Sequence, residues 1–244
     1  MAHNQNITEK NLQHDVEVMF DSIAWRYDFL NHLLSFGIDR CWRRKAVDTI
    51  PAEFRDGKII DVATGTGDLA IEAARLRPSK IIGIDISDEM LEIGRKKVNA
   101  ADLGNTIELI RCNSMNICFD DNTFDVAMAA FGVRNFEDPE GGLAEIRRIL
   151  LPGGFIMILE FSKPDGFIFK HLYNFYFRYL LPVTGALFSR HRKAYRYLNE
   201  SVMRFADKEK FIRIMVDAGF SEVKQRRLTH GIATIYTGVK KVIQ

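Results

Sequence analysis

Residues 58–68 read K-I-I-D-V-A-T-G-T-G-D, and this stretch decides the fold class. The β-branched run Lys58–Val62 predicts a short buried strand, and Gly65 and Gly67 predict a tight turn into a helix over residues 67–75. Glycine is needed where the backbone must approach a ligand closely, because a side chain would block the approach. The amides at the start of the next helix also point at whatever binds there. A ligand site is therefore expected at this turn.

Three acids surround the turn. Asp85 ends the next apolar run, 20 residues after Gly65, where a carboxylate can accept both hydroxyls of a ribose. Asp61 closes the first strand, and its charge suits the ammonium of a methionine moiety. Asp68 follows the glycines and adds negative charge, which disfavours a pyrophosphate. These acids favour a nucleoside cofactor that carries a methionine over a dinucleotide.

The rest of the chain alternates strands and helices until its end. Helices are expected after Ser87 and after Asp138-Pro139, each with a capping residue at its start. Repeated strand–helix–strand units predict an α/β, doubly wound, mostly parallel seven-stranded sheet, and the last two strands lack a helix between them and predict an antiparallel hairpin. The expected strands are residues 58–62, 80–84, 107–112, 124–130, 155–161, 222–228 and 233–240.

Composition narrows the class of protein. The 244 residues carry a net charge of +2, which gives no field for nucleic acid. The cysteines Cys41, Cys112 and Cys118 are odd in number and lack C-x-x-C spacing, so we expect neither a disulfide framework nor a zinc site, and a reducing compartment. Residues 1–15 are polar and no run of about 18 apolar residues occurs, so a cytoplasmic protein without a signal peptide or transmembrane helix is expected.

Four longer segments carry a resemblance to a known family. They are residues 20–43, 61–68, 121–135 and 150–164, which include Y-D-F-L-N (27–31), F-G-V-R-N (131–135) and L-E-F-S-K-P (159–164). Over about residues 16–240 the sequence resembles the ubiquinone/menaquinone biosynthesis C-methyltransferases.

The resemblance implies a Rossmann-like class I methyltransferase that uses S-adenosyl-L-methionine, without a metal. The implied substrate is a polyprenylated quinol that is methylated on a ring carbon, with demethylmenaquinol favoured and a ubiquinone-pathway benzoquinol as the alternative. From the turn and the resemblance together, the expected cofactor-binding residues are Asp61, Gly65, Thr66, Gly67, Asp85, Ile86, Asn113 and Ser114. Asn113 follows the third strand and can bond an adenine edge, or it is simply a polar turn residue.

Candidates for catalysis come from two motifs. Arg134 follows the fourth strand and is expected to contact the quinol oxygen, where it would stabilise a phenolate or position a water, because a guanidinium is not a free base. Tyr27, Asp28 and Asn31 are expected to close over the substrate, or else to pack and cap helices. Asp39 stands where many family members have His, which argues against an acid/base role there.

Two helical regions flank or interrupt the core. Residues 1–50 are expected to form a cap on a core of residues 51–244, and residues 163–205 form a helical insertion that is rich in aromatic residues. This insertion either packs on the core, or admits an isoprenoid tail and lies at a membrane interface. Basic residues follow the aromatic stretch, and they are either a solvated face or a contact to anionic lipid.

Three other functions compete with quinol methylation. An NAD-dependent oxidoreductase is possible because residues 65–70 formally fit G-x-G-x-x-A, although the flanking acids oppose it. A nucleoside-binding regulator would need no substrate pocket, and an RNA methyltransferase would need a broad basic surface, which the near-neutral charge does not offer. Oligomeric state is not legible in the sequence.

Overall fold

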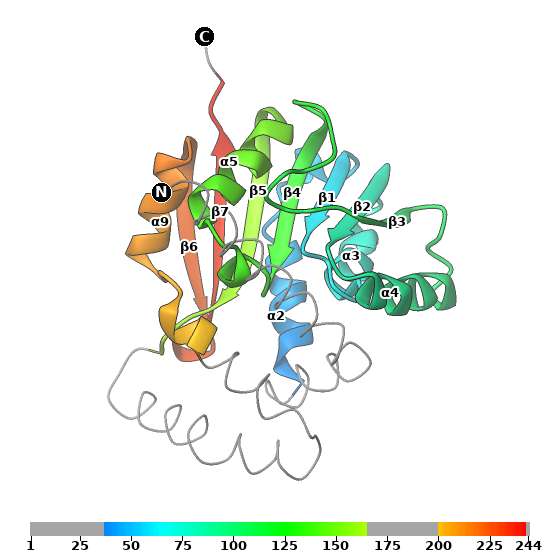
Figure 1. Cartoon of the computed structure of the whole chain (residues 1–244), viewed down its shortest axis with the longest axis horizontal. Helices are drawn as coiled ribbons and strands as arrows, with labels where there is room; N and C mark the ends of the chain where they lie inside the picture. Colours follow the sequence, from blue (N-terminus) through cyan, green and yellow to red (C-terminus); the bar gives the residue numbers. More distant parts are fainter. Residues whose placement is uncertain (1–36, 165–199, 243–244) are drawn as a thin grey trace, which may run out of the picture.

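Seven strands form one sheet in the computed structural model, which describes residues 37–164 and 200–242 (Figure 1). The strand order is β3-β2-β1-β4-β5-β7-β6. The strands are β1 (Lys58–Val62), β2 (Lys80–Asp85), β3 (Ile107–Arg111), β4 (Phe124–Ala130), β5 (Leu150–Phe161), β6 (Phe220–Leu228) and β7 (Ala233–Lys240).

The first five strands pair in parallel, and the last two are antiparallel. β7 pairs with β5 and with β6, so a C-terminal hairpin completes an otherwise parallel sheet. The fold class expected from the sequence is confirmed. The strand order reverses at β1, which runs beside β2 on one side and β4 on the other. Ligands of doubly wound sheets collect outside the carboxyl ends of strands at such a reversal.

Helices cover both faces of the sheet (Figure 1). One apolar cluster joins a sheet face to α2, α3 and α4, and another joins the opposite face to α5 and α9. Neighbouring residues of β1 alternate between them, since Ile59 belongs to the first cluster and Ile60 to the second. The helices are α2 (Ile38–Val47), α3 (Asp68–Ala73), α4 (Asp88–Ala100), α5 (Pro139–Ile149) and α9 (Glu209–Asp217).

Helix starts follow the capping rules that the sequence suggested. The Ser87 hydroxyl accepts a hydrogen bond from the Met90 amide at 3.2 Å, and the Asp138 carboxylate caps α5 in front of Pro139. The helix after the glycine turn is shorter than residues 67–75, because α3 tightens after Ala73 into a 3₁₀ turn, η2 (Ala74–Leu76). Gly67 is its N-cap, with a positive φ of 79° that favours glycine.

The proposed cap and insertion fall mostly outside the described residues. Tyr27, Asp28 and Asn31 lie there, as do the aromatic stretch and the basic residues after it. Of the cap, α2 is described; it packs on α3 and β5, and its Trp42 is buried and donates to Thr229 Oγ1 at 2.8 Å. Within residues 37–164 and 200–242, no helix is both long and apolar enough to cross a bilayer.

Candidate functional site

A cavity of about 400 Å³ opens at the carboxyl ends of β1, β2, β3 and β4. This is the edge of the sheet at which the strand order reverses. Arg134 lines it, and so do five of the eight expected cofactor residues, namely Gly65, Asp85, Ile86, Asn113 and Ser114. Apolar side chains complete the wall, namely Ile84, Met90, Met115, Phe131, Phe136, Phe205, Phe211 and Ile214.

Asp85 holds the glycine turn in shape. Its Oδ2 accepts a hydrogen bond from the Gly65 amide at 2.8 Å, and its Oδ1 accepts one from the Ser87 amide at 3.0 Å. Gly65 has a φ of +56°, and a Cβ built on it would meet nothing within 4 Å. The turn therefore presents bare backbone to the cavity, with the carboxylate of Asp85 beside it. A carboxylate has about four lone-pair sites, so it can accept hydrogen bonds from backbone amides and from a ribose hydroxyl at once.

Asp61 lies behind the turn and does not line the cavity. It is fully buried in β1, and its Oδ2 accepts a hydrogen bond from the Thr64 hydroxyl at 2.6 Å. Its Oδ1 makes no hydrogen bond of standard geometry among the described residues, although the backbone amide of Ala70 interacts with the carboxyl group and lowers its pKa. Burial raises the pKa of Asp61 to about 7, although the Thr64 hydroxyl and the charge of Arg43 lower it. Asp61 can therefore act on a ligand in the cavity only through its charge and through the turn that it supports.

Thr66, Gly67 and Asp68 face away from the cavity, toward α4. The Lys97 ammonium contacts the Thr66 hydroxyl at 3.0 Å and the Asp68 carboxylate, and Arg43 lies 3.7 Å from Asp68. The sequence suggested that Asp68 adds negative charge at the ligand. The structure corrects this inference, because two cations neutralise that charge. A Cβ on Gly67 would approach Leu109 rather than a ligand, so this glycine serves the backbone conformation.

The segment after β3 supplies the wall opposite the turn. Asn113 and Ser114 both line the cavity, as predicted from their position after the strand. The Asn113 side-chain oxygen accepts a hydrogen bond from the Met115 amide at 2.8 Å, so it also forms the local turn. The two interpretations of Asn113, ligand contact and turn residue, are therefore compatible.

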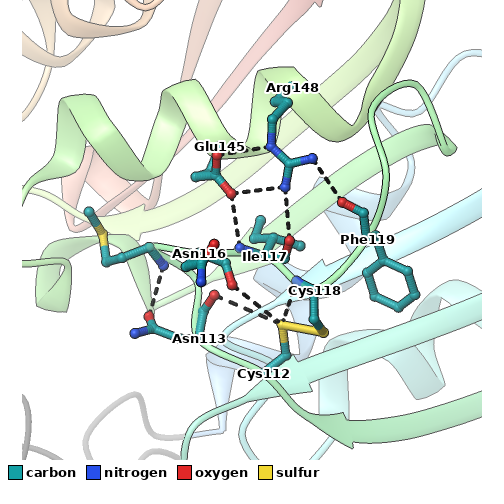
Figure 2. The surroundings of a disulfide bond; sticks show 9 residues. Cys112, Asn113, Asn116, Ile117, Cys118, Phe119, Glu145 and Arg148 are labelled. Atoms are coloured by element: carbon teal, nitrogen blue, oxygen red, sulfur yellow. Dashed lines mark hydrogen bonds and ion pairs between the residues drawn. A yellow bond between two sulfur atoms is a disulfide. The ribbon is translucent and has the colours of Figure 1, made fainter.

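Two cysteines bracket this segment and form a disulfide (Figure 2). The sequence predicted no disulfide framework, and this single bridge departs from that prediction. The prediction rested on the odd count and on the missing C-x-x-C spacing. The turn between the cysteines, with a bridge between Asn113 and Asn116, brings their Cα atoms to 6.1 Å, a separation that a disulfide spans. Cys41 is exposed and unpaired.

An ion pair on α5 anchors the far side of the same segment (Figure 2). Glu145 accepts a hydrogen bond from the Ile117 amide at 2.9 Å, and Arg148 donates to the carbonyls of Ile117 and Phe119, each at 2.8 Å. Arg148 lowers the pKa of Glu145 and so keeps it ionised. The segment with Asn113 and Ser114 is thus fixed at both ends. Sequence reasoning missed this anchor, because its residues lie 28 to 31 positions apart.

Arg134 lines the cavity from the side of β4, in the 3₁₀ turn η3 (Val133–Asn135) that follows this strand. Its side chain is only 3% exposed and pairs with the buried Glu160 at 2.8 Å between Nη1 and Oε1. Its Nη1 also donates to the Phe131 carbonyl, and its Nε to the Ser201 hydroxyl at 3.3 Å. Phe131 itself has a φ of +58°, a strained conformation for a bulky residue. The guanidinium is therefore held in one orientation.

Asp39, which replaces the His of many family members, is buried in α2 and forms an ion pair with Arg43. Arg43 in turn lies over the Phe131 ring, with 5.6 Å from Cζ to the ring centroid. In the part of the chain that the structure describes, no group of three or more His, Cys, Asp or Glu residues could hold a metal ion.

Residues 6–240 match the family described as ubiE/COQ5 methyltransferase. The chain belongs to this family. It is 49% identical over 236 residues to the ubiquinone/menaquinone biosynthesis C-methyltransferase UbiE of Geotalea daltonii, covering 96% of this chain and 99% of that protein. It is 46% identical to a demethylmenaquinone methyltransferase of Bacteroides fragilis, covering 92% of each chain. Both the resemblance and the enzyme class expected from the sequence are confirmed.

The fold agrees with solved methyltransferase structures. A SAM-dependent methyltransferase of Thermotoga maritima, described as a possible histamine N-methyltransferase, superposes with a TM-score of 0.66, covering 92% of this chain and 99% of that one. Its sequence identity of 20% supports the fold alone. As a member of the ubiE/COQ5 family, the protein uses S-adenosylmethionine as its cofactor. The open backbone at Gly65 and the carboxylate of Asp85 in the same cavity fit that molecule.

Gly65→Ala should weaken binding of S-adenosylhomocysteine about 10-fold, because its methyl group would enter the space at the turn. Gly37→Ala is the matched control. Gly37 has a φ of +74° with open space around it, but it caps α2. Both variants should lose about 1–2 kcal/mol of stability from backbone strain. Calorimetric titration measures the binding, and equal affinities of the two variants would contradict this role for Gly65.

The raised pKa of Asp61 predicts a pH-dependent stability. The folded protein holds a proton on Asp61 up to about pH 7, whereas the ordinary value is 3.8. The contribution of Asp61 to the free energy of unfolding should therefore fall as pH rises from about 4 to about 7, and level off above. Urea unfolding at several pH values measures this contribution as the difference in the free energy of unfolding between the wild type and the Asp61→Asn variant. Thr64→Val removes a bond that lowers this pKa, so it should extend the fall to higher pH; a flat difference would contradict the prediction.

Proposed function

We propose that the protein transfers a methyl group from S-adenosylmethionine to a ring carbon of a polyprenylated quinol, most specifically demethylmenaquinol to form menaquinol. A benzoquinol of the ubiquinone pathway is the second candidate. One observation carries the proposal: Asp85, expected at the cofactor ribose, and Arg134, expected at the acceptor oxygen, line the same cavity. The names of the relatives from Geotalea daltonii and Bacteroides fragilis support both the quinone substrate and the two alternatives.

The chain contributes positioning and electrostatics. Bound S-adenosylmethionine supplies an electrophilic methyl group. Asp85 and the segment of Asn113 and Ser114 orient the nucleoside half at one wall, and holding two reactants aligned lowers the barrier by several kcal/mol. Arg134 at the opposite wall stabilises the negative charge on the quinol oxygen once its proton has left, and this charge makes the ring carbon nucleophilic. Within this proposal Asp61 balances the methionine ammonium.

The apolar wall suits an aromatic acceptor. Phe131 and Phe136 line the cavity next to Arg134, and Phe131 packs on Phe161 with 4.5 Å between ring centroids. A small number of polar groups in an otherwise apolar cavity is typical of small-molecule sites. The apolar surroundings strengthen the interaction between the guanidinium and a phenolate, because charges interact more strongly at low dielectric.

Tyr27, Asp28 and Asn31 belong to the proposal on sequence grounds, as residues of a cap over residues 1–50 that closes on the substrate. The division into this cap and a core of residues 51–244 with an insertion at 163–205 is part of the same proposal. The alternative role of Tyr27, Asp28 and Asn31 is helix packing and capping. Single substitution of Tyr27 by Phe, with KM for the quinol as the readout, distinguishes substrate contact from packing.

We also propose that the protein contacts a membrane surface, because its proposed acceptor carries a polyprenyl tail. A polyprenyl tail resides in lipid, and residues 167–188 are rich in aromatic side chains, followed by Arg190, Arg192, Lys193 and Arg196. The protein would work from the cytoplasm at the inner face of the membrane. Flotation with anionic vesicles that contain quinol should carry the protein upward at low salt. No flotation under those conditions would remove this part of the proposal.

The acceptor is tested with S-adenosylmethionine labelled in its methyl group. The protein is incubated with reduced demethylmenaquinone or with the reduced benzoquinone precursor, and kcat/KM is measured for each. We expect transfer to the naphthoquinol at the higher kcat/KM. The reverse preference would assign the benzoquinol instead, and no transfer to either would defeat the proposed function.

A further inference from the structure

Glu160 is a buried acid that the function described above does not use. It is the second-last residue of β5, is 0% exposed, and pairs across the sheet with Thr234 of β7. It does not line the cavity. A carboxylate in the middle of a sheet is costly unless charged and hydrogen-bonded partners compensate for its lost hydration.

The hydrogen bonds of Glu160 with Arg134 and Phe161 lie at the cavity end of the sheet. Its Oε1 accepts hydrogen bonds from Arg134 Nη1 at 2.8 Å and from the Phe161 amide at 2.9 Å. Its Oε2 accepts one from the Arg134 backbone amide at 3.1 Å. The Glu160 carboxylate therefore binds both the side chain and the main chain of Arg134, and this fixes the turn η3 as well as the guanidinium.

The remaining contacts of Arg134 complete a fixed arrangement. The guanidinium lies over the Phe161 ring, with 5.4 Å from Cζ to the ring centroid, and Nε reaches Ser201. Its Nη1 also bonds the carbonyl of Phe131, the strained residue that lines the cavity. Glu160 supplies a buried carboxylate for the ion pair with Arg134.

Stability alone does not explain this pair. Apolar residues of similar volume often replace a buried ion pair without loss of stability, whereas removal of one partner is strongly destabilising. What a carboxylate offers, and an apolar residue does not, is a defined direction for the guanidinium. From these contacts we infer that Glu160 is a positioning residue for methyl transfer, which acts through Arg134 and sets the direction from which the guanidinium meets the acceptor oxygen. This inference rests on the proposed function.

The test is a double-mutant cycle with Glu160→Gln and Arg134→Lys on the quinol methylation assay. Glu160→Gln should lower kcat roughly 10- to 100-fold, because a misdirected guanidinium no longer meets the developing charge. The affinity for S-adenosylhomocysteine should stay within about twofold, since Glu160 touches no residue expected at the cofactor. The double variant should be no slower than Arg134→Lys alone, and a merely structural role would not produce this non-additivity.

Two further variants keep the inference falsifiable. Glu160→Asp retains the charge but withdraws it by one methylene; if Glu160→Gln fails to fold, this variant should fold and show the same loss of kcat. Glu72→Gln is the control; it breaks a partly exposed pair between Glu72 of α3 and Arg75 of η2, and should methylate at the wild-type rate. A Glu160→Asp or Glu160→Gln enzyme within twofold of wild-type kcat, or additive losses in the cycle, would overturn the inference. An inactive wild-type protein would instead defeat the proposed function.

Discussion

Replacing Arg134 with lysine should lower kcat for quinol methylation about 100-fold, with affinity for S-adenosylhomocysteine unchanged. A lysine ammonium lacks the planar fork, so it cannot serve Glu160, the Phe131 carbonyl and Ser201 together as the guanidinium does. The charge stays while its geometry is lost. Steady-state kinetics with the reduced quinone, and calorimetry for the cofactor product, separate the two effects.

Arg213→Lys is the control for the Arg134 variant. Arg213 is exposed on α9, so its replacement should leave both kcat and KM at wild-type values. If Arg134→Lys retains full activity with unchanged KM, the guanidinium has no role at the acceptor. If the variant loses affinity for S-adenosylhomocysteine as strongly as it loses kcat, Arg134 supports the whole cavity rather than the acceptor.

The second large effect is expected at Asp85. Asp85→Ala should weaken binding of S-adenosylhomocysteine roughly 100-fold or more, because hydrogen bonds to an ionised group contribute about 1.5–3 kcal/mol each. The variant loses both the proposed ribose contacts and the bond that holds the Gly65 amide. Calorimetric titration with S-adenosylhomocysteine, and with adenosine as a shorter ligand, measures the loss for the nucleoside half.

Asp88→Ala is the matched control for Asp85. Asp88 is an acid three residues further on, in the first turn of α4, with a side chain that is 59% exposed and lies 3.3 Å from Arg111. It does not line the cavity, and its replacement should leave the affinity within about twofold. Equal affinities of the Asp85 and Asp88 variants would remove Asp85 from the cofactor site.

The fold could be predicted from the sequence because the features that decide it are local. The strands Lys58–Val62 and Phe124–Ala130 have the bounds that their apolar runs predict, and Ser87 and Asp138 cap the helices that they precede. The hairpin of β6 and β7 followed from the missing helix between them. Where bounds differ, as at α3, the tightening of a helix end into a 3₁₀ turn leaves little mark on apolar spacing.

The site could be predicted only in part, because several of its contacts join residues that are far apart in the sequence. Gly65, Asp85 and Asn113 could be placed at one edge from strand order alone. The pair of Glu160 with Arg134, 26 residues apart, could not, nor could the neutralisation of Asp68 by Lys97. Within the family motifs F-G-V-R-N and L-E-F-S-K-P, however, Arg134 and Glu160 are both charged residues at the ends of apolar strands, which is the pattern that could have suggested the pair.

The most direct test of the proposed reaction is the chemical position of the transferred methyl group. The protein is incubated with S-adenosylmethionine carrying a ¹³C-labelled methyl group and with reduced demethylmenaquinone, and the product is examined by NMR and mass spectrometry. We expect one labelled methyl group on the ring carbon, with both quinol oxygens unsubstituted and menaquinol as the product. A label on a quinol oxygen, or an unlabelled quinol with the cofactor unconsumed, would contradict carbon methylation by this enzyme.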